Sequence, residues 1–392
     1  MKINFIVNSF PTTSETFLFN LVCGLEQRGI DVLVCAHSKK NDIDLYKDKL
    51  SKWSSKIEYI QNKNIPIVIF KDFFEKRRRK NIRKFVSLYG VKKGFKKYIK
   101  WRFINQQEPD LIYFSFSGIG CSYIDVLKCE NEIPFIFSCR GSAEKIKPLV
   151  DKKRKQILTE LINLSSKIHC VSDDMKETLS EFGDVENKVF INYPSIEKSS
   201  FINKNDDNNS NEFRILSTGR LHYQKGYIYC LNAIKILVDK GYNIKYHICG
   251  SGPEEGLIKF MIKELGIVDH VIMHGRVSND RVKELIYLSD AFLLGSIYEG
   301  IANAAIEAMI SGLPVVSSSS GGMRELITND FNGILVPLFS DVKLANGLEY
   351  LIQNPNKSKE FSINAKKTVL DRFTLENQLD VFIKNFKGLS NN

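Results

Sequence analysis

The chain has 392 residues, of which 43% are hydrophobic and 26% are charged, so it is long enough for two domains with full cores and is not intrinsically disordered. No apolar run approaches the roughly 20 residues that a membrane-spanning helix needs. The net charge of +11 comes from one segment, residues 71–102, which holds fourteen Lys and Arg against two acidic residues; the rest of the chain is close to neutral.

Short apolar runs alternate with amphipathic helical stretches along the whole chain. The runs predict strands at 3–7, 31–36, 111–114, 134–139, 168–171 and 189–192, and then at 214–218, 244–249, 271–274, 291–294, 314–317 and 333–336. Continuous apolar strands separated by helices indicate parallel sheets that are covered on both faces. Two such series predict an α/β protein with two doubly wound, Rossmann-like domains.

The boundary between the two series is a polar, Asn-rich stretch. We expect an N-terminal domain at 1–198, a linker at 199–212 and a C-terminal domain at 213–372. Apolar residues at helical spacing between 374 and 389 predict a terminal helix within 373–392 that packs back on the first domain.

The first apolar run is too short for a signal peptide and is broken at once by Asn8, Ser9 and Pro11, so we expect a cytoplasmic protein. In the loop that follows, Thr12 and Glu15 have the spacing of a capping box at the start of the first helix.

The basic segment 71–102 interleaves aromatic and apolar residues with its cations. This pattern is typical of an amphipathic helix on an anionic leaflet, and it predicts peripheral attachment to the inner face of the cell membrane. A solvated helix face is the alternative. A nucleic-acid patch ranks last, and we expect no nucleic-acid partner.

No metal site is expected. The eight Cys include no C-x-x-C pair, and the six His have no ligand spacing. Asp42 and Asp44 form a D-x-D, but they lie in a polar stretch and not at the end of an apolar strand, so we interpret them as a solvated loop.

The first candidate site motif follows the strand predicted at 214–218. Gly219 turns the chain, and Arg220 and Lys225 lie just past the carboxyl end of that strand, where open α/β sheets bind ligands. Arg offers a fork for two phosphate oxygens, and Lys offers a compact charge. The alternative is a pair of solvated surface cations.

The second candidate motif is the stretch YEGIANAAIEAMIS at 298–311. Glu299 lies in a loop, and a helix is predicted to begin near Asn303 as its cap. The amides at the start of that helix suit a diphosphate. Glu307 is suited to two ribose hydroxyls, and its small, apolar neighbours predict a buried setting for it. An exposed helix residue is the alternative.

The motifs G-R-L-x-x-x-K-G, G-S-G-P, E-G-x-x-N-A-x-x-E-A-M and G-L-P-V-V follow one another in the second half. In this order they resemble the retaining glycosyltransferases of family 4. The resemblance implies the GT-B fold, with two domains facing across a cleft, a nucleotide-sugar donor on the second domain and no metal ion or other cofactor. It also implies a donor site of Gly219, Arg220, Lys225, Gly250, Val277, Glu299, Gly300, Ile301, Asn303, Ala304 and Glu307.

Within that site, the resemblance implies that Arg220 and Lys225 hold the diphosphate, Glu307 the ribose and Glu299 the donor sugar, with Arg220, Lys225 and Glu299 as the catalytic set. In the first domain, P-x-x-S-E-T-F resembles a subgroup of bacterial polysaccharide-assembly transferases, which implies an acceptor side with Ser14 and Glu15. Arg140 replaces a His of many relatives and is suited to bind sugar or phosphate oxygens.

The expected activity is therefore transfer of a hexose from a nucleotide-sugar, which we expect to be a UDP-sugar, to a glycan or lipid-linked acceptor with retention of configuration. Cell-surface polysaccharide synthesis is the expected setting. The alternatives are another enzyme of the same fold, such as a sugar-nucleotide epimerase or a phosphorylase, and a non-catalytic scaffold subunit.

Overall fold

The computed structural model describes residues 1–12, 15–39, 56–60, 65–129, 132–197 and 212–390. The chain divides into two compact units. Unit 1 contains Met1–Val171, Met175–Asn192 and Leu379–Asn392, and unit 2 contains Ser172–Asp174 and Tyr193–Gln378. The stretch expected to be the linker lies almost wholly outside the described residues.

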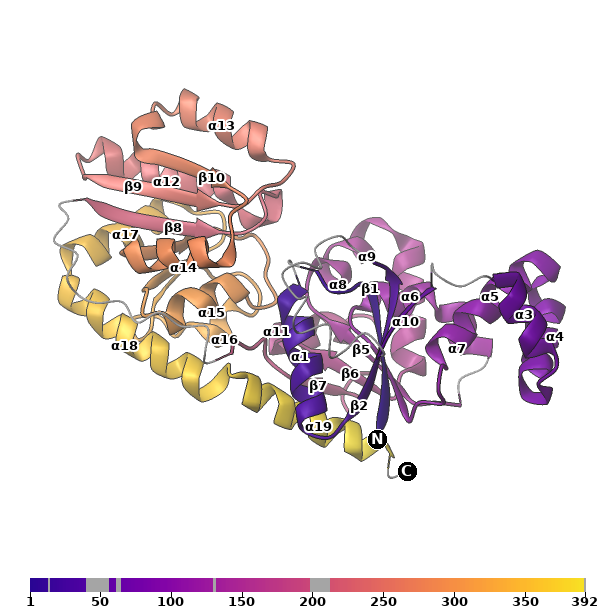
Figure 1. Ribbon diagram of the computed structural model, residues 1–392. Helices are drawn as coiled ribbons and strands as arrows, with labels where there is room; N and C mark the ends of the chain where they lie inside the picture. The colour runs from indigo at the N-terminus through magenta and orange to yellow at the C-terminus, as the bar shows by residue number, and fades with distance from the viewer. Residues whose placement is uncertain (13–14, 40–55, 61–64, 130–131, 198–211, 391–392) are drawn as a thin grey trace. The chain divides into compact units, whose positions relative to one another are not determined.

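Unit 1 is built on a seven-stranded parallel sheet in the order β3-β2-β1-β4-β5-β6-β7. The strands are β1 (Lys2–Ser9), β2 (Asp31–Ser38), β3 (Ile57–Tyr59), β4 (Leu111–Phe114), β5 (Phe135–Cys139), β6 (Lys167–Cys170) and β7 (Val189–Ile191). The helices are α1 (Thr16–Gln27), α3 (Ile65–Phe73), α4 (Lys76–Tyr89), α5 (Val91–Ile104), α6 (Ser117–Ser122), α7 (Ile124–Cys129), α8 (Ser142–Lys145), α9 (Lys147–Val150), α10 (Lys152–Leu164) and α11 (Asp173–Ser180) (Figure 1).

Unit 2 is built on a six-stranded parallel sheet in the order β10-β9-β8-β11-β12-β13. The strands are β8 (Phe213–Thr218), β9 (Ile244–Cys249), β10 (Val271–Gly275), β11 (Ala291–Leu294), β12 (Val315–Ser318) and β13 (Ile334–Val336). The helices are α12 (Tyr227–Asp239), α13 (Glu255–Glu264), α14 (Asn279–Leu288), α15 (Asn303–Ile310), α16 (Met323–Leu326), α17 (Asp341–Gln353) and α18 (Pro355–Arg372). The last helix is α19 (Leu375–Ser390).

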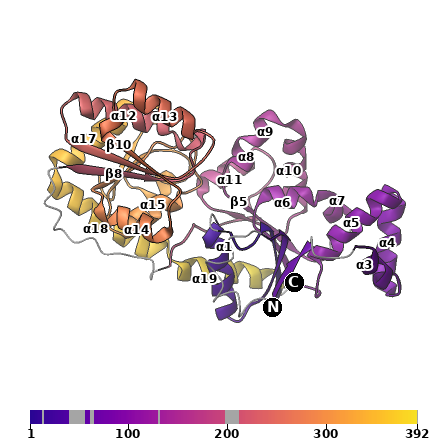
Figure 2. The same ribbon diagram turned by 45° about the horizontal axis from the view of Figure 1, so that its top comes forward.

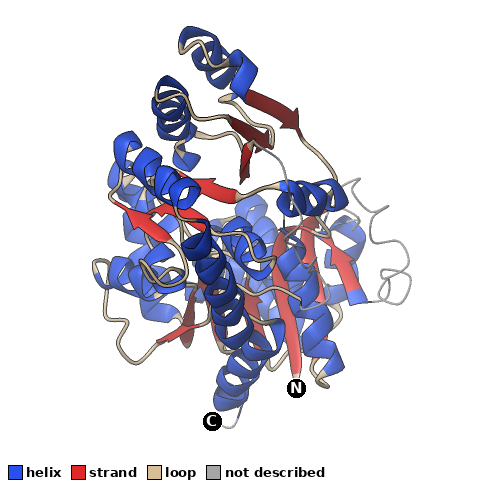
Figure 3. Cartoon of the chain, turned by 90° about the vertical axis from the view of Figure 1, so that its left-hand side faces the viewer, coloured by secondary structure: helices blue, strands red, loops and turns tan. Residues whose placement is uncertain are grey.

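All twelve predicted strands are present, and the prediction of two doubly wound parallel sheets is confirmed. Helices lie on both sides of each sheet (Figures 2 and 3). The strand β3 was not predicted; it is a half-buried edge strand of three residues that pairs with β2. With three residues, Ile-Glu-Tyr, it is too short to form an apolar run that would predict a strand.

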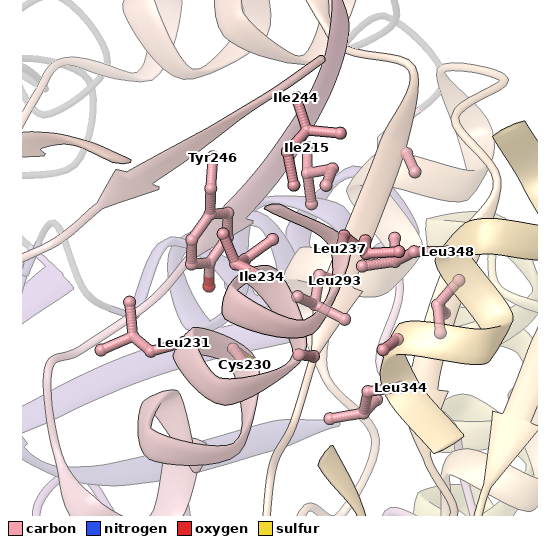
Figure 4. Close-up of a cluster of buried hydrophobic side chains, with 14 of the residues drawn as sticks. Ile215, Cys230, Leu231, Ile234, Leu237, Ile244, Tyr246, Leu293, Leu344 and Leu348 are labelled. Carbon is pink, nitrogen blue, oxygen red and sulfur yellow. The ribbon is translucent and has the colours of Figure 1, made fainter. Parts of the chain in front are cut away.

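The core of unit 2 shows why its strands are apolar along their whole length. Figure 4 shows Ile215 of β8 and Leu293 of β11 packing against side chains of α12 and α17. Their chain neighbours Leu216 and Leu294 pack on the opposite face with α14 and α15. Successive strand residues point to opposite faces, so a sheet covered on both sides needs apolar residues at both.

The terminal helix α19 closes the core of unit 1 with two buried aromatic side chains. Phe382 contacts the rings of Tyr113 and His169, with centroids 5.7 Å and 4.8 Å away, and Phe386 lies 5.9 Å from Tyr113. Leu379 of α19 packs against Gly24 of α1, where a Cβ atom would collide with the leucine side chain. The last residues of the chain therefore belong to the fold of unit 1.

Candidate functional site

The sheet of unit 2 has a topological switch point between β8 and β11. From β8 the chain first builds β9 and β10 on one side, and it then returns to add β11 on the other side. The connections that leave β8 and β11 therefore run in opposite directions, which opens a crevice at the carboxyl ends of these strands. The loops that follow β8 and β11 carry both candidate motifs of the sequence analysis.

Lys225 and Glu299 form an ion pair across this switch point. Lys225 Nζ lies 2.5 Å from Glu299 Oε1, and the same oxygen accepts a hydrogen bond of 2.7 Å from Ser296 Oγ. Only 22% and 13% of the two charged side chains are exposed. The resemblance implied that these residues contact different parts of a donor, whereas the structure joins them to each other.

Two glycines hold the loops that carry this pair. Gly226 has a φ of 59°, and a Cβ there would lie 2.0 Å from Gly295 O; Gly321 has a φ of 53°, and its Cβ would lie 1.9 Å from Glu299 O. A hydrogen bond of 2.8 Å from Ile297 N to Gln224 O joins the same two loops. Only glycine permits these approaches, so the backbone itself fixes the distance between Lys225 and Glu299.

The other predicted donor residues lie on the same edge of the sheet. Gly219 N donates to Cys249 O, and Gly250 N donates to Gly275 O, so the loops after β8, β9 and β10 are tied together. Arg220 is exposed and has no ion-pair partner among the described residues. Gly300 and Ile301 are buried beside Glu299, and Val277 and Ala304 are partly buried and pack against the same core cluster.

The N-cap of α15 lies one residue before the predicted one. Ala302 is the N-cap, Asn303 is the first helical residue, and no side chain caps the helix. The prediction of an Asn303 cap is therefore wrong. No hydrogen bond is made by the N–H groups of Asn303 and Ala304 within the described part of the chain, so these amides and the positive end of the helix remain available to an anion.

Glu307 is exposed, and the prediction of a buried setting for it is wrong. It lies one turn after Asn303 on the outward face of α15, whereas Ala305, Ile306 and Ala308 point into the core. Desolvation nevertheless raises the pKa of Glu307 to about 7, while the charge of Lys283 lowers it. Both facts fit a carboxyl group that solvent reaches from one side.

The acceptor-side residues belong to unit 1. Ser14 lies outside the described residues, as do Asp42 and Asp44. Glu15 is the N-cap of α1 without a side-chain cap bond, and the Thr12 hydroxyl is buried with no partner, so the predicted capping box is wrong. Arg140 directly follows β5, and its guanidinium stacks 4.5 Å above the ring of Phe17.

The basic segment 71–102 is not one amphipathic helix. It runs from the end of α3 through α4 and α5, which stand together beyond α7 (Figures 1 and 2). Many of its apolar side chains belong to the core: Ile82, Phe85, Tyr98, Ile99 and Trp101 are buried. The carboxylate of Asp72 is buried as well, where Arg78, Arg102 and Tyr98 donate to it.

An exposed apolar cluster nevertheless lies at the start of this segment. We call it the aromatic patch, and it consists of Ile67, Phe70, Phe73 and Phe74, which are 52%, 68%, 44% and 73% exposed. The rings of Phe70 and Phe74 pack edge to face at 5.2 Å. Half of the patch precedes Lys71, so the sequence analysis, which followed the charge, missed it. Ser296 was missed as well, although it directly follows the loop glycine after β11.

No helix among the described residues has the length and apolarity to cross a membrane.

Two protein-family models match the chain, one in each half. Residues 14–199 match the model described as Glycosyltransferase Family 4, and residues 198–368 match the model described as Glycosyl transferases group 1.

Individual relatives carry related names. The putative colanic acid biosynthesis glycosyltransferase WcaL of Escherichia coli K12 is 25% identical over 361 residues, which cover 86% of this chain and 87% of that protein. The amylovoran biosynthesis glycosyltransferase AmsK of Erwinia amylovora is 27% identical over 370 residues, with the same coverage of 86% and 87%. An uncharacterized glycosyltransferase of Methanocaldococcus jannaschii is 32% identical over 229 residues, 54% of this chain and 57% of that protein.

Among solved structures, Anabaena HepE in complex with UDP and glucose superimposes with a TM-score of 0.76 over 99% of this chain and 100% of that chain, at 18% identity. This likeness shows the fold.

The raised pKa of Glu307 predicts a pH-dependent gain in stability for Glu307→Gln. Between the ordinary pKa of 4.5 and the raised value of about 7, the folded protein keeps a proton that the unfolded chain has lost, so wild-type stability falls as the pH rises through this window. The glutamine side chain does not titrate in this range, so the stability of the variant lacks this dependence on pH. Thermal unfolding should show the Tm of the variant rising relative to wild type between about pH 5 and pH 8, by only roughly 1 °C because solvent screens the exposed carboxyl group.

Glu264→Gln, which removes an exposed carboxyl group from α13, is the matched control for the loss of one negative charge. A Tm difference for Glu307→Gln that stays constant across this pH range would contradict the assigned protonation.

Proposed function

The two halves of the chain match a family 4 and a group 1 glycosyltransferase model and have the GT-B fold, and from this premise we propose that the protein transfers a hexose from a UDP-sugar to a glycan or lipid-linked acceptor with retention of configuration. We propose polysaccharide synthesis as its setting, in keeping with the names of the colanic acid and amylovoran enzymes that it matches over most of their length.

The observation that carries this proposal is the ion pair of Lys225 and Glu299 at the switch point of unit 2. A half-buried ammonium, an exposed guanidinium at Arg220 and the free amides that open α15 all lie on loops at one edge of the sheet. Such a set suits a diphosphate. The solved structure of HepE with UDP and glucose shares the fold, and this supports a UDP-sugar as the donor.

Each residue has its own task in the proposed complex. Arg220, Lys225 and the amides of Asn303 and Ala304 hold the diphosphate, and Glu307 accepts hydrogen bonds from the ribose hydroxyls. Phosphate oxygens compete with Glu299 for the Lys225 ammonium, because both are anionic acceptors. The carboxylate of Glu299, still held by Ser296 Oγ, then becomes available to the hydroxyls of the donor sugar.

The proposed reaction moves one sugar and one proton. The bond between the anomeric carbon and the diphosphate oxygen breaks, and the acceptor hydroxyl forms a new bond to that carbon on the same face. The acceptor proton passes to the departing phosphate oxygen. Arg220 and Lys225 stabilise the negative charge that develops on the diphosphate. The amides at the start of α15 stabilise the same charge, because the helix already holds them in place.

The assignment predicts different defects for the two acidic residues. Glu299→Ala should lower kcat by at least about tenfold and should not raise the Kd for UDP, because in the proposed complex the carboxylate faces the sugar and its removal frees Lys225 for the diphosphate. Glu307→Ala should raise the Kd for UDP by about tenfold or more, as expected for the loss of hydrogen bonds to a charged group. Turnover, followed by mass spectrometry with a panel of nucleotide-sugars, and calorimetric UDP titration measure the two quantities.

Glu299→Gln keeps the shape and removes the charge, and it serves as the matched variant for the ion pair. Equal effects of the Glu299 and Glu307 variants on both quantities would rule out this division of roles.

We also propose that the aromatic patch and the cations around it attach unit 1 to an anionic membrane surface. Lys71, Lys76, Lys80 and Arg83 are exposed and have no ion-pair partner within the described ranges. Four exposed apolar side chains next to unpaired cations match the two requirements of such a surface, apolar insertion and attraction to anionic lipid. A lipid-linked acceptor would be found there.

Flotation with vesicles tests the membrane proposal. Phe70→Ser together with Phe74→Ser should lower binding to phosphatidylglycerol-containing vesicles by at least about tenfold, because each buried Phe contributes about 1.5–3 kcal/mol. Leu257→Ser with Phe260→Ser, two exposed apolar residues of α13, is the matched control. Wild-type protein that does not bind anionic vesicles, or binds neutral ones equally well, would exclude this role.

A further inference from the structure

The guanidinium of Arg140 is a cation that forms no ion pair within the described part of the chain. It lies 4.5 Å above the ring of Phe17 and 6.0 Å from the ring of Phe116, and it also acts on the neutral hydroxyl of Tyr113. The Nε and Nη2 atoms are buried and have no hydrogen-bond partner, and no ion pair of Arg140 occurs among the residues that the structure describes. Buried guanidinium groups are ordinarily paired, because leaving such donors unsatisfied is costly.

Two hydroxyl groups on the neighbouring strands are also without partners. Thr12 follows β1 and is 6% exposed, and Ser115 follows β4 and is fully buried; neither side-chain oxygen has a hydrogen-bond partner among the residues that the structure describes. The strands β1, β4 and β5 are adjacent and parallel, so Thr12, Ser115 and Arg140 share the carboxyl edge of the sheet. Ligands of doubly wound sheets bind at this edge.

The nearest acidic residue along the chain is already committed elsewhere. The buried carboxylate of Glu144 accepts from Ser117 Oγ and from Gly141 N, and Ser117 is in turn bonded by Arg154 Nη2 at 2.7 Å. The charge of Arg140 therefore acts on neutral groups instead. It is the second cause, after desolvation, that lowers the pKa of the buried His169 to about 3.

We propose that Arg140, together with the hydroxyls of Thr12 and Ser115, forms a binding site for the carboxylate or phosphate group of an acidic saccharide acceptor. This inference rests on the proposed glycosyl transfer and adds the chemical class of the acceptor to it. Nε and one terminal nitrogen of an Arg form a planar fork that matches two oxygens of a carboxylate or phosphate, and the hydroxyls supply further donors to the same anion. Arg140 is half-buried, so solvent reaches the residue from one side.

Thermal unfolding of the full chain, with UDP present to occupy the donor site, tests this proposal. The probes are glucuronate, inorganic phosphate and the neutral sugar glucose. Glucuronate or phosphate should raise the Tm of the wild type, whereas glucose should not, and the stronger of the two anions distinguishes a carboxylate site from a phosphate site.

Two variants separate this site from the donor site. Arg140→Met keeps the apolar stacking on Phe17 and should lose the response to the anions, with at least about tenfold weaker binding, while its response to UDP is unchanged. Arg220→Met should show the reverse pattern. Arg140→Lys keeps the charge without the fork and should also bind the anions at least about tenfold more weakly, which preserves the test if Arg140→Met does not fold.

Equal stabilisation of wild type and Arg140→Met by the anions would overturn the proposal, as would a wild type that responds to UDP but to neither anion. A wild type that responds to the anions but not to UDP would instead refute the donor site and leave the oxyanion site standing.

Discussion

The ion pair of Lys225 and Glu299 forms because the surrounding backbone brings the two residues close together. The residues are 74 positions apart, and they meet because Gly226 and Gly321 let three loops approach at distances that any Cβ would prohibit. Those loops follow strands on both sides of the switch point of unit 2. The fold thus brings opposite charges together in a crevice at low exposure, where a ligand that replaces one partner has a strong electrostatic effect.

The cations of the two units differ in their counter-ions, and this difference fits the roles that we propose for them. In unit 2 the ammonium of Lys225 is neutralised by Glu299, and we propose that a diphosphate replaces this carboxylate. In α4 and α5, Arg78 and Arg102 neutralise the buried Asp72 and so serve the fold. Arg140 has no such partner, and its charge acts on Tyr113 and His169. An unpaired cation at a sheet edge is costly for stability, which is why we assign it to a ligand.

The sequence was sufficient for the sheets because continuous apolar runs and their spacing reflect burial on both faces. It was insufficient where the answer depends on direction or on distant contacts. Glu307 was expected to be buried because of its neighbours, yet Asn303 and Glu307 share the outward face of α15 while Ala305, Ile306 and Ala308 face inward. The helical period places Asn303 and Glu307 on one face, but only the packing of α15 on the sheet decides that this face points outward. The pairing of Lys225 with Glu299 and the exposure of the aromatic patch both arise from tertiary packing that no local pattern records.

The central claim is that the loops at the switch point of unit 2 bind the nucleoside diphosphate of the donor. Hydrogen–deuterium exchange of the full chain with and without UDP measures this most directly. We predict slower exchange in two segments far apart in sequence, residues 219–226 and 299–307, because their amides would gain a ligand or lose access to solvent. Unchanged exchange in both segments at saturating UDP, or protection confined to unit 1, would contradict the claim.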